Sequence, residues 1–275
     1  HYPLRRQRQM CIRDRRYIDD EAESCVKNFF TTVCDNLSSS SDETTGKIAF
    51  EYDFNGSTMG YASYTIGSKP GGTNLTYGFS TREELDADFR FGSPVVPPMV
   101  YRTFESENLE SLEFGLKSDF FNGKARANIA VFSYDYENLQ FQATDPDPFR
   151  GGVANIPNSE MDGVEVEFTA LLSDSITFDM NLGFIDTEVT SEYEVLDNVL
   201  AYQYFFTEEQ ERYDLREDVK GNMLAKTPEF TADATLTYEG ELASGNPINV
   251  ILQFVRRGEF MQRVSNNPSV DTVPE

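Results

Sequence analysis

The sequence predicts an all-β protein, an antiparallel up-and-down sheet that forms a fragment of a transmembrane β-barrel. Three observations support this prediction: strict alternation of polar and apolar residues, short turns that alternate with long loops, and strands long enough to cross a bilayer. We expect about eight strands in a curved sheet that cannot close on itself. The long loops should lie along one rim and the short turns along the other.

The clearest pattern lies in residues 161–189. Apolar side chains at the even positions of 176–184 alternate with polar or small ones at the odd positions, and residues 164–170 show the same alternation. The connection Ser173-Asp174-Ser175 has room only for a tight turn. This stretch therefore predicts a long antiparallel hairpin with one apolar and one polar face.

Similar alternation marks the remaining strands. Asn122-Gly123 is the strongest short hairpin signal in the chain. The other predicted strands cover residues 47–54, 59–67, 109–121, 125–141, 227–238 and 248–260.

Short and long connections follow each other in turn. The predicted short turns lie near 55–58, 122–124, 173–175 and 240–246, and the predicted long loops are 68–108, 142–160 and 190–226. Residues 207–219, inside the last of these loops, could hold a short helix. Successive connections of an up-and-down sheet fall on opposite rims, so all the long loops should share one rim.

Residues 17–45 are polar, Ser-rich and acidic with no sustained period, which predicts a loop before the first strand. Cys25 and Cys34 lie inside this segment. In an exported protein two such cysteines predict a local disulfide. A pair of free thiols is the alternative.

The predicted strands are longer than the typical soluble strand of about 5–6 residues. Their polar face carries many acidic side chains, which a dry core could not hold without partners but a water-filled lumen accepts. Lipid on the apolar side and water on the polar side fit both features. A soluble β-rich module, such as a sandwich or a lectin-like domain, is the alternative.

Composition excludes several classes of function. The formal net charge of −24 argues against a nucleic-acid partner, which needs a basic surface. The only histidine is His1, so histidine-based catalysis and zinc binding have no support. Glu165 and Glu167 are explained as lumen carboxylates, and acidic loop residues such as Asp145 and Asp147 as solvated groups rather than a Ca²⁺ site. We expect no enzyme activity, no cofactor and no resident metal.

Aromatic residues in the last long loop are the weak candidates for ligand contact. They could touch a ligand, or they could form the aromatic girdle where a strand leaves the bilayer. These residues are Tyr202, Tyr204, Phe205 and Phe206.

Four segments, in order, resemble the barrel of TonB-dependent outer-membrane receptors over roughly residues 46–265. They are YASYTIGSKPGG (61–72), ENLESLEFGLKSDFFNGKARANIAVFSYDYENLQ (107–140), GVEVEFTALLSDSITFDMNLGFIDTEV (163–189) and LAKTPEFTADATLTYE (224–239). Ile66 departs from the family pattern, which commonly has a basic residue there.

The resemblance implies a location in the bacterial outer membrane, in contact with its lipid. It also implies energy-coupled uptake of a scarce nutrient, a ferric siderophore complex by default. Such receptors have a barrel of about 22 strands, and they engage the TonB complex through an N-terminal plug region. The plug, the TonB box and the terminal strand are expected outside this chain.

Residues 1–15 resemble the translation of a sequencing adapter, and the run from Met10 to Arg15 carries that resemblance. We therefore expect a non-native segment over 1–15 and a partial outer-membrane barrel domain over 16–275.

Overall fold

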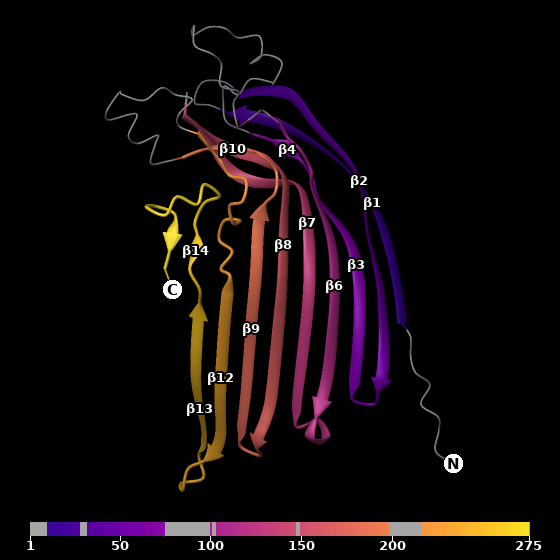
Figure 1. Cartoon of the computed structure of the whole chain (residues 1–275), viewed down its shortest axis with the longest axis vertical. Coiled ribbons are helices and arrows are strands. Elements are labelled where there is room, and N and C mark those ends of the chain that lie inside the picture. Colours follow the sequence, from indigo (N-terminus) through magenta and orange to yellow (C-terminus); the bar gives the residue numbers. More distant parts are fainter. Residues whose placement is uncertain are drawn as a thin grey trace.

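The protein is described by a computed structural model, which defines the backbone of residues 10–27, 32–74, 100, 103–146, 149–197 and 216–274. Nine strands in chain order form one antiparallel sheet, which curves in space as Figure 1 shows. They are β1 (Met10–Lys27), β2 (Thr32–Asn55), β3 (Thr58–Lys69), β6 (Glu107–Phe120), β7 (Ala125–Pro146), β8 (Phe149–Ser173), β9 (Ile176–Val189), β12 (Phe230–Glu241) and β13 (Pro247–Arg257).

The remaining elements are short. Three two-stranded pairs accompany the sheet, and one 3-10 turn, η1 (Phe121–Gly123), joins β6 to β7. The pairs are β4 (Gly72–Thr73) with β5 (Thr103–Phe104), β10 (Glu194–Leu196) with β11 (Arg216–Asp218), and β14 (Phe260–Met261) with β15 (Thr272–Val273). Within the described ranges, no helix has the length and hydropathy required to cross a bilayer.

The predicted hairpin at 161–189 is confirmed. β8 and β9 pair antiparallel, with Val164 opposite Phe184 and Phe168 opposite Met180. Because directly opposed residues of a sheet share a face, these side chains lie together on one surface. The up-and-down order and the two-faced pattern predicted from the sequence are therefore both present.

One face of the sheet is an exposed apolar surface, here called the outer face. A single cross-strand row from β2 to β12 consists of apolar side chains, and Phe114, Val131 and Phe184 in it are each about half exposed. The members of this row are Phe50, Ala62, Phe114, Val131, Val164, Phe184 and Phe230. Large apolar patches of this kind face lipid or another protein rather than water.

The strands are staggered along the sheet. The pairing row that passes through Thr58, at the start of β3, continues to Phe168 and Phe254, well inside β8 and β13. The short turns therefore step progressively along the strand direction, as Figure 1 shows. A steady stagger of this kind accompanies the strand tilt of a barrel.

The opposite face, here called the inner face, carries the polar residues. Two aromatic side chains lie over glycines of the adjacent strand: the Tyr61 ring covers Gly115, and the Phe132 ring covers Gly163. A Cβ at Gly115 would come within 2.0 Å of the Tyr61 ring, and one at Gly163 within 2.3 Å of Phe132. Because these glycines have no side chain, the aromatic rings can lie flat against the sheet at these two positions.

The predicted loop at 17–45 is wrong. Most of this stretch belongs to β1 and to the first half of β2, which pair along their length with one irregularity between Glu23 and Ser24. The first strand of the sheet is therefore β1 rather than residues 47–54, and β13 forms the other edge. Backbone pairing beside an existing strand needs no alternation of side chains, so the polar sequence did not reveal it.

The predicted loop at 142–160 is also wrong, because β7 and β8 continue through it and pair to Pro146 and Phe149. The backbone irregularity occurs instead at Asn138, which has φ of 57° and is skipped in the pairing register. Within the possible helix at 207–219, residues 216–218 form strand β11, and residues 207–215 lie outside the described part.

Candidate functional site

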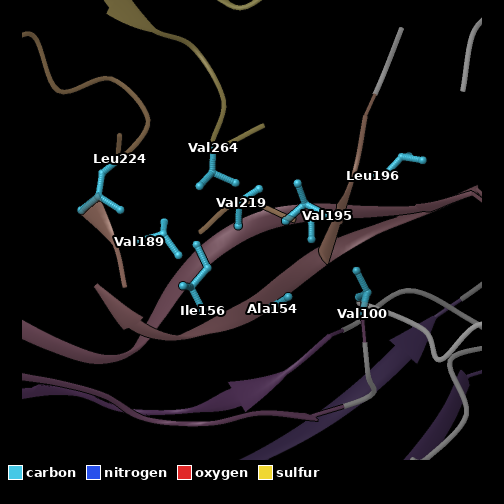
Figure 2. Packing of buried hydrophobic residues seen from close by; sticks show 10 residues of the cluster. Val100, Ala154, Ile156, Val189, Val195, Leu196, Val219, Leu224 and Val264 are labelled. Atoms are coloured by element: carbon cyan, nitrogen blue, oxygen red, sulfur yellow. The ribbon is translucent and has the colours of Figure 1, made fainter. Parts of the chain in front are cut away.

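A small hydrophobic core sits at the long-loop rim, beyond the regular part of the sheet. Ile156 and Val189 are fully buried in it, and Val219 is fully buried beside them. Figure 2 shows these side chains converging from separate segments. The buried members are Val100, Ala143, Ala154, Ile156, Val189, Val195, Leu196, Val219, Leu224 and Val264.

The extended ends of β7 and β8 form the base of this rim core. Ala154 and Ile156 come from β8, and Leu139 and Phe141 of β7 pack against the cluster. The ring of Tyr193 meets that of Phe141 edge-on, with centroids 6.0 Å apart. The connections β3–β6 and β9–β12 and the segment after β13 all contribute residues, so the core joins parts far apart in sequence.

Hydrogen bonds from asparagine side chains also link these segments. Asn74 accepts a hydrogen bond from the Val153 N–H at 2.8 Å and donates one to the Val153 carbonyl at 2.9 Å. Asn155 pairs in the same way with Glu105, at 2.9 and 3.0 Å. Each amide thus reproduces the donor–acceptor pairing of a neighbouring strand where no strand is present.

A third asparagine repeats the arrangement near the C-terminal segment. The Asn266 side chain accepts from the Met223 N–H and donates to the Met223 carbonyl, both at 2.9 Å. Asn222 donates in turn to the carbonyls of Val264 and Ser265, at 2.9 and 3.1 Å. The segment before β12 and the segment after β13 therefore each bind the backbone of the other through an asparagine side chain.

Two fully buried carboxylates complete the rim. Asp271 accepts from the Ser265 hydroxyl at 2.6 Å, and its other oxygen lies 3.4 Å from Nε of Arg263. Asp197 accepts from the Asn267 side chain at 2.7 Å. Buried carboxylates require such partners, so these contacts fix the loops at one geometry.

Two acidic neighbours in β11 differ in their protonation behaviour. Burial raises the pKa of the Glu217 carboxyl, and the nearby charge of Asp197 raises it further. Backbone N–H groups of Lys220 and Tyr193 donate to Asp218 at 3.1 and 3.0 Å, which holds the pKa of that carboxyl below its ordinary value.

The inner face below the rim is lined with paired polar side chains. The Tyr61 hydroxyl donates to Glu113 at 2.5 Å, and Asn128 donates to Glu167 at 2.8 Å. In the same cross-strand row as Glu167, Asn181 donates to Asp233, and in the next row of this face Thr169 donates to Asp179. This face presents hydrogen-bonding groups and negative charge to whatever fills the space inside the curve.

The structure describes some of the predicted site residues, whereas others lie outside the described part of the chain. Glu165 and Glu167 lie on the inner face, as predicted. Cys25 and Cys34 stand directly opposite each other on β1 and β2. In the described ranges, no group of three His, Cys, Asp or Glu side chains could hold a metal ion. The aromatic candidates Tyr202, Tyr204, Phe205 and Phe206 lie outside the described residues.

Sequence reasoning missed the rim core and its asparagine bridges. Residues 142–160 contain an apolar alternation, including Ala154 and Ile156, that could have signalled a buried segment. The bridging asparagines carry no such signal, because asparagine is equally common in turns.

The curved open sheet, its exposed apolar outer face and its charged inner face together define a slice of an outer-membrane β-barrel. The family described as "TonB dependent receptor-like, beta-barrel" matches residues 16–273, and the chain belongs to that family. Barrels of this family lie in the bacterial outer membrane and act in reception and transport rather than as enzymes. A soluble β-rich module is not favoured.

Related proteins agree with this assignment. The "Probable TonB-dependent siderophore receptor PiuA" of Acinetobacter baumannii is 26% identical over 143 residues, which cover 52% of this chain and 17% of that protein. The solved structure of the siderophore receptor PiuA from Acinetobacter baumannii aligns with a TM-score of 0.64 at 18% identity, over 97% of this chain and 33% of that one.

The ferric yersiniabactin uptake receptor FyuA of Yersinia pestis gives a TM-score of 0.58 at 16% identity, over 87% of this chain and 29% of that chain. At these identities the solved structures show the shared fold. The chain spans about a third or less of the length of each relative.

Proposed function

We propose that this chain forms part of a receptor that takes up a ferric siderophore-type complex across the outer membrane. The observation that supports this proposal is the packing at the long-loop rim. There a hydrophobic core and the hydrogen bonds of asparagine side chains hold the bases of the long loops in one arrangement. A binding site needs such rigid support if it is to select one ligand. The related proteins named above, two of them siderophore receptors, support the ligand class.

The outer face supports lipid as the first partner. Exposed apolar residues occur on this face from β2 to β13 and follow the strand stagger, as a bilayer-spanning band does. The aromatic residues Tyr202, Tyr204, Phe205 and Phe206 are proposed to contact the nutrient complex from the last long loop.

The energy for uptake is proposed to come from the TonB complex, acting through an N-terminal plug encoded outside this chain. The inner face suits a plug that carries basic groups, because Glu113 on β6 and Glu165 and Glu167 on β8 place negative charge on it. We further propose that residues 1–15 are not native, which the start of the family match at residue 16 supports. Sequencing the gene from genomic DNA tests both points.

Ligand binding tests the central proposal. The complete receptor in detergent is titrated with ferric hydroxamate and ferric catecholate complexes, and the fluorescence of a dye attached at the rim reports binding. We expect saturable binding of one ferric complex and none of its iron-free form. Equal binding of both forms, or binding of neither ferric class, would overturn the assignment of iron complexes as cargo.

A further inference from the structure

The tripeptide Phe-Asn-Gly occurs twice in the chain, each time at a turn of the short-turn rim (Figure 1). Phe54-Asn55-Gly56 leads from β2 into β3, and Phe121-Asn122-Gly123 joins β6 to β7. In an Asn-Gly pair the backbone nitrogen of the glycine can attack the asparagine side chain, because glycine has no Cβ to hinder the approach. The two turns therefore present the same chemical groups in two different geometries.

The Asn122–Gly123 turn has the type I′ geometry. Asn122 has φ of 59° and ψ of 37°, and Gly123 has φ of 84°. The Lys124 N–H donates to the Phe121 carbonyl at 3.3 Å, which closes the four-residue turn. Both central residues are thus left-handed, as a type I′ turn requires.

Rotation of one peptide group converts this turn into a type II′ turn. The first central residue then keeps its positive φ, whereas its ψ becomes about −120°. The peptide group between Asn122 and Gly123 makes no hydrogen bond to the part of the chain that the structure describes, so the rotation breaks none there. A Cβ at Gly123 would meet no described atom within 4 Å, so the turn has open space around it.

The flanking strands hold the rest of the hairpin in place while the turn rotates. Phe120 pairs with Ala125, and the Arg126 guanidinium donates from Nε and Nη2 to the Asp119 carboxylate at 2.6 and 3.1 Å. Asn122 is exposed to solvent. Water and hydroxide therefore reach the turn while the strands stay paired.

The rotated turn brings the two reacting atoms together. In an L-amino acid, Cβ lies a third of a turn from the backbone nitrogen about the Cα–C bond. A ψ of about −120° therefore places the nitrogen of the next residue beside Cβ. In the type II′ form the Gly123 nitrogen thus lies next to the side chain of Asn122.

We propose that Asn122 is a site of spontaneous deamidation that starts from this type II′ form. The Gly123 nitrogen gives its proton to hydroxide and forms a bond to Cγ of Asn122. The Cγ–Nδ2 bond breaks, and the released group takes a proton from water and leaves as ammonia. Water then opens the five-membered succinimide at one of its two carbonyls, which gives aspartate or isoaspartate at position 122.

The Asn55–Gly56 turn lacks the features that favour this reaction. Asn55 is the last residue of β2, and neither Asn55 nor Gly56 is left-handed. The Oδ1 atom of Asn55 accepts hydrogen bonds from the Ser57 N–H and the Ser57 hydroxyl, both at 2.9 Å. The Asn55 side chain must give up these contacts before it reacts, so it should be converted more slowly.

Peptide mapping by mass spectrometry tests the proposal. The complete receptor, folded in detergent, is incubated at mildly alkaline pH, and the peptides that contain the two tripeptides are followed with time. A converted peptide is heavier by the difference between a hydroxyl and an amino group. We expect Asn122 to be converted about tenfold faster than Asn55, a factor that corresponds to about 1.4 kcal/mol and lies in the range of the hydrogen bonds that Asn55 must break.

Unfolded receptor is the matched control. In urea the two Phe-Asn-Gly tripeptides have the same local sequence without either turn geometry, so their rates should become similar. Gly123→Ala places a Cβ beside the attacking nitrogen, and it should slow the reaction at Asn122 without changing that at Asn55. Ser57→Ala removes one of the two hydrogen bonds to Asn55, and it should speed the reaction at Asn55 alone.

Equal rates at the two sites of the folded receptor, or a faster reaction at Asn55, would overturn the proposal. So would a folded receptor in which Asn122 stays intact although both sites react in urea.

Discussion

At the scale of single residues, the rim depends on side chains that replace missing backbone partners. Asn155 satisfies both the N–H and the carbonyl of Glu105, which otherwise have no strand beside them. A hydrogen bond of this kind contributes about 0.5–1.5 kcal/mol. The loops are thus held by amide groups as well as by apolar burial.

Replacing this amide should loosen the β5–β8 contact. We expect Asn155→Ala to destabilise the rim by about 2 kcal/mol, because the two hydrogen bonds to Glu105 and the one donated to the Asn138 carbonyl are lost. Hydrogen exchange measured at the Glu105 amide should become faster by more than tenfold. Asn246→Ala is the control, because the Asn246 side chain donates to the Ser244 hydroxyl within an exposed turn far from Glu105. Equal acceleration in both variants would contradict the role assigned to Asn155.

The rim core makes a second prediction at this scale. Ile156 is fully buried and Ile251 is 60% exposed, so the same truncation should have unequal effects. We expect Ile156→Ala to lower the free energy of unfolding by about 2–5 kcal/mol and Ile251→Ala by less than about 1 kcal/mol. Urea unfolding in phospholipid vesicles gives both values. A cost for Ile251→Ala as large as that for Ile156→Ala would show that the rim core is not a packed unit.

At the scale of elements, side-chain alternation predicted strands well where one face meets a different environment from the other. It placed β3, β6, β9 and β12 close to their observed positions. It failed for β1 and for the start of β2, where the sequence is mostly polar with no sustained alternation and backbone pairing defines the strand. It also failed for the ends of β7 and β8, where Gly and Pro suggested a loop although the strands continue.

The β10–β11 pair should weaken in acid. Asp218 has a lowered pKa in the folded protein, so it stabilises this pair above about pH 4 and loses that contribution as the pH falls through its folded pKa. Glu217 has a raised pKa and acts in the opposite sense. Hydrogen exchange of the Tyr193 and Lys220 amides, measured as a function of pH, tests this. After correction for the intrinsic exchange rates, exchange at both amides should become faster below about pH 4.

Single substitutions distinguish the contribution of the Asp218 carboxyl group from that of Glu217. Asp218→Asn should lose protection at neutral pH and flatten the acid response, because the neutral amide accepts the Lys220 and Tyr193 N–H bonds less strongly. Glu217→Gln should keep the acid response. An acid response that survives in Asp218→Asn would refute the assignment.

The β1–β2 pair offers a test of the predicted disulfide. Opposed residues on antiparallel strands have Cα atoms about 4.5–5.5 Å apart, within the range that a disulfide spans. We therefore propose that Cys25 and Cys34, which are in direct register, are bonded in the exported protein. Mass mapping of a non-reduced digest should recover the two linked peptides, with a reduced digest as the control. Recovery of both cysteines as free thiols, or of a bond to Cys11, would contradict this pairing.

At the scale of the whole molecule, the sheet is a curved slice with two unpaired edge strands, β1 and β13. Its two faces differ in chemistry: the outer face carries a band of apolar rows with acidic residues toward the long-loop rim, and the inner face carries charged and hydrogen-bonded rows. The sequence could predict this division because the period of two is exact along each strand. The loop packing at the rim could not be predicted, since it joins residues that no local pattern relates.

The central claim is that the outer face meets lipid and the inner face meets water. Neighbouring positions on β6 test it most directly, because Phe114 and Leu116 point outward while Glu113 and Lys117 lie on the inner face. Single cysteines are introduced at these four positions in a chain whose native cysteines are replaced by serine, and the protein is inserted into vesicles carrying nitroxide-labelled lipid. We predict that fluorophores attached at 114 and 116 are quenched by the lipid label, whereas cysteines at 113 and 117 react with a water-soluble maleimide. Equal reaction with maleimide at all four positions, or quenching on the inner face instead, would contradict the account.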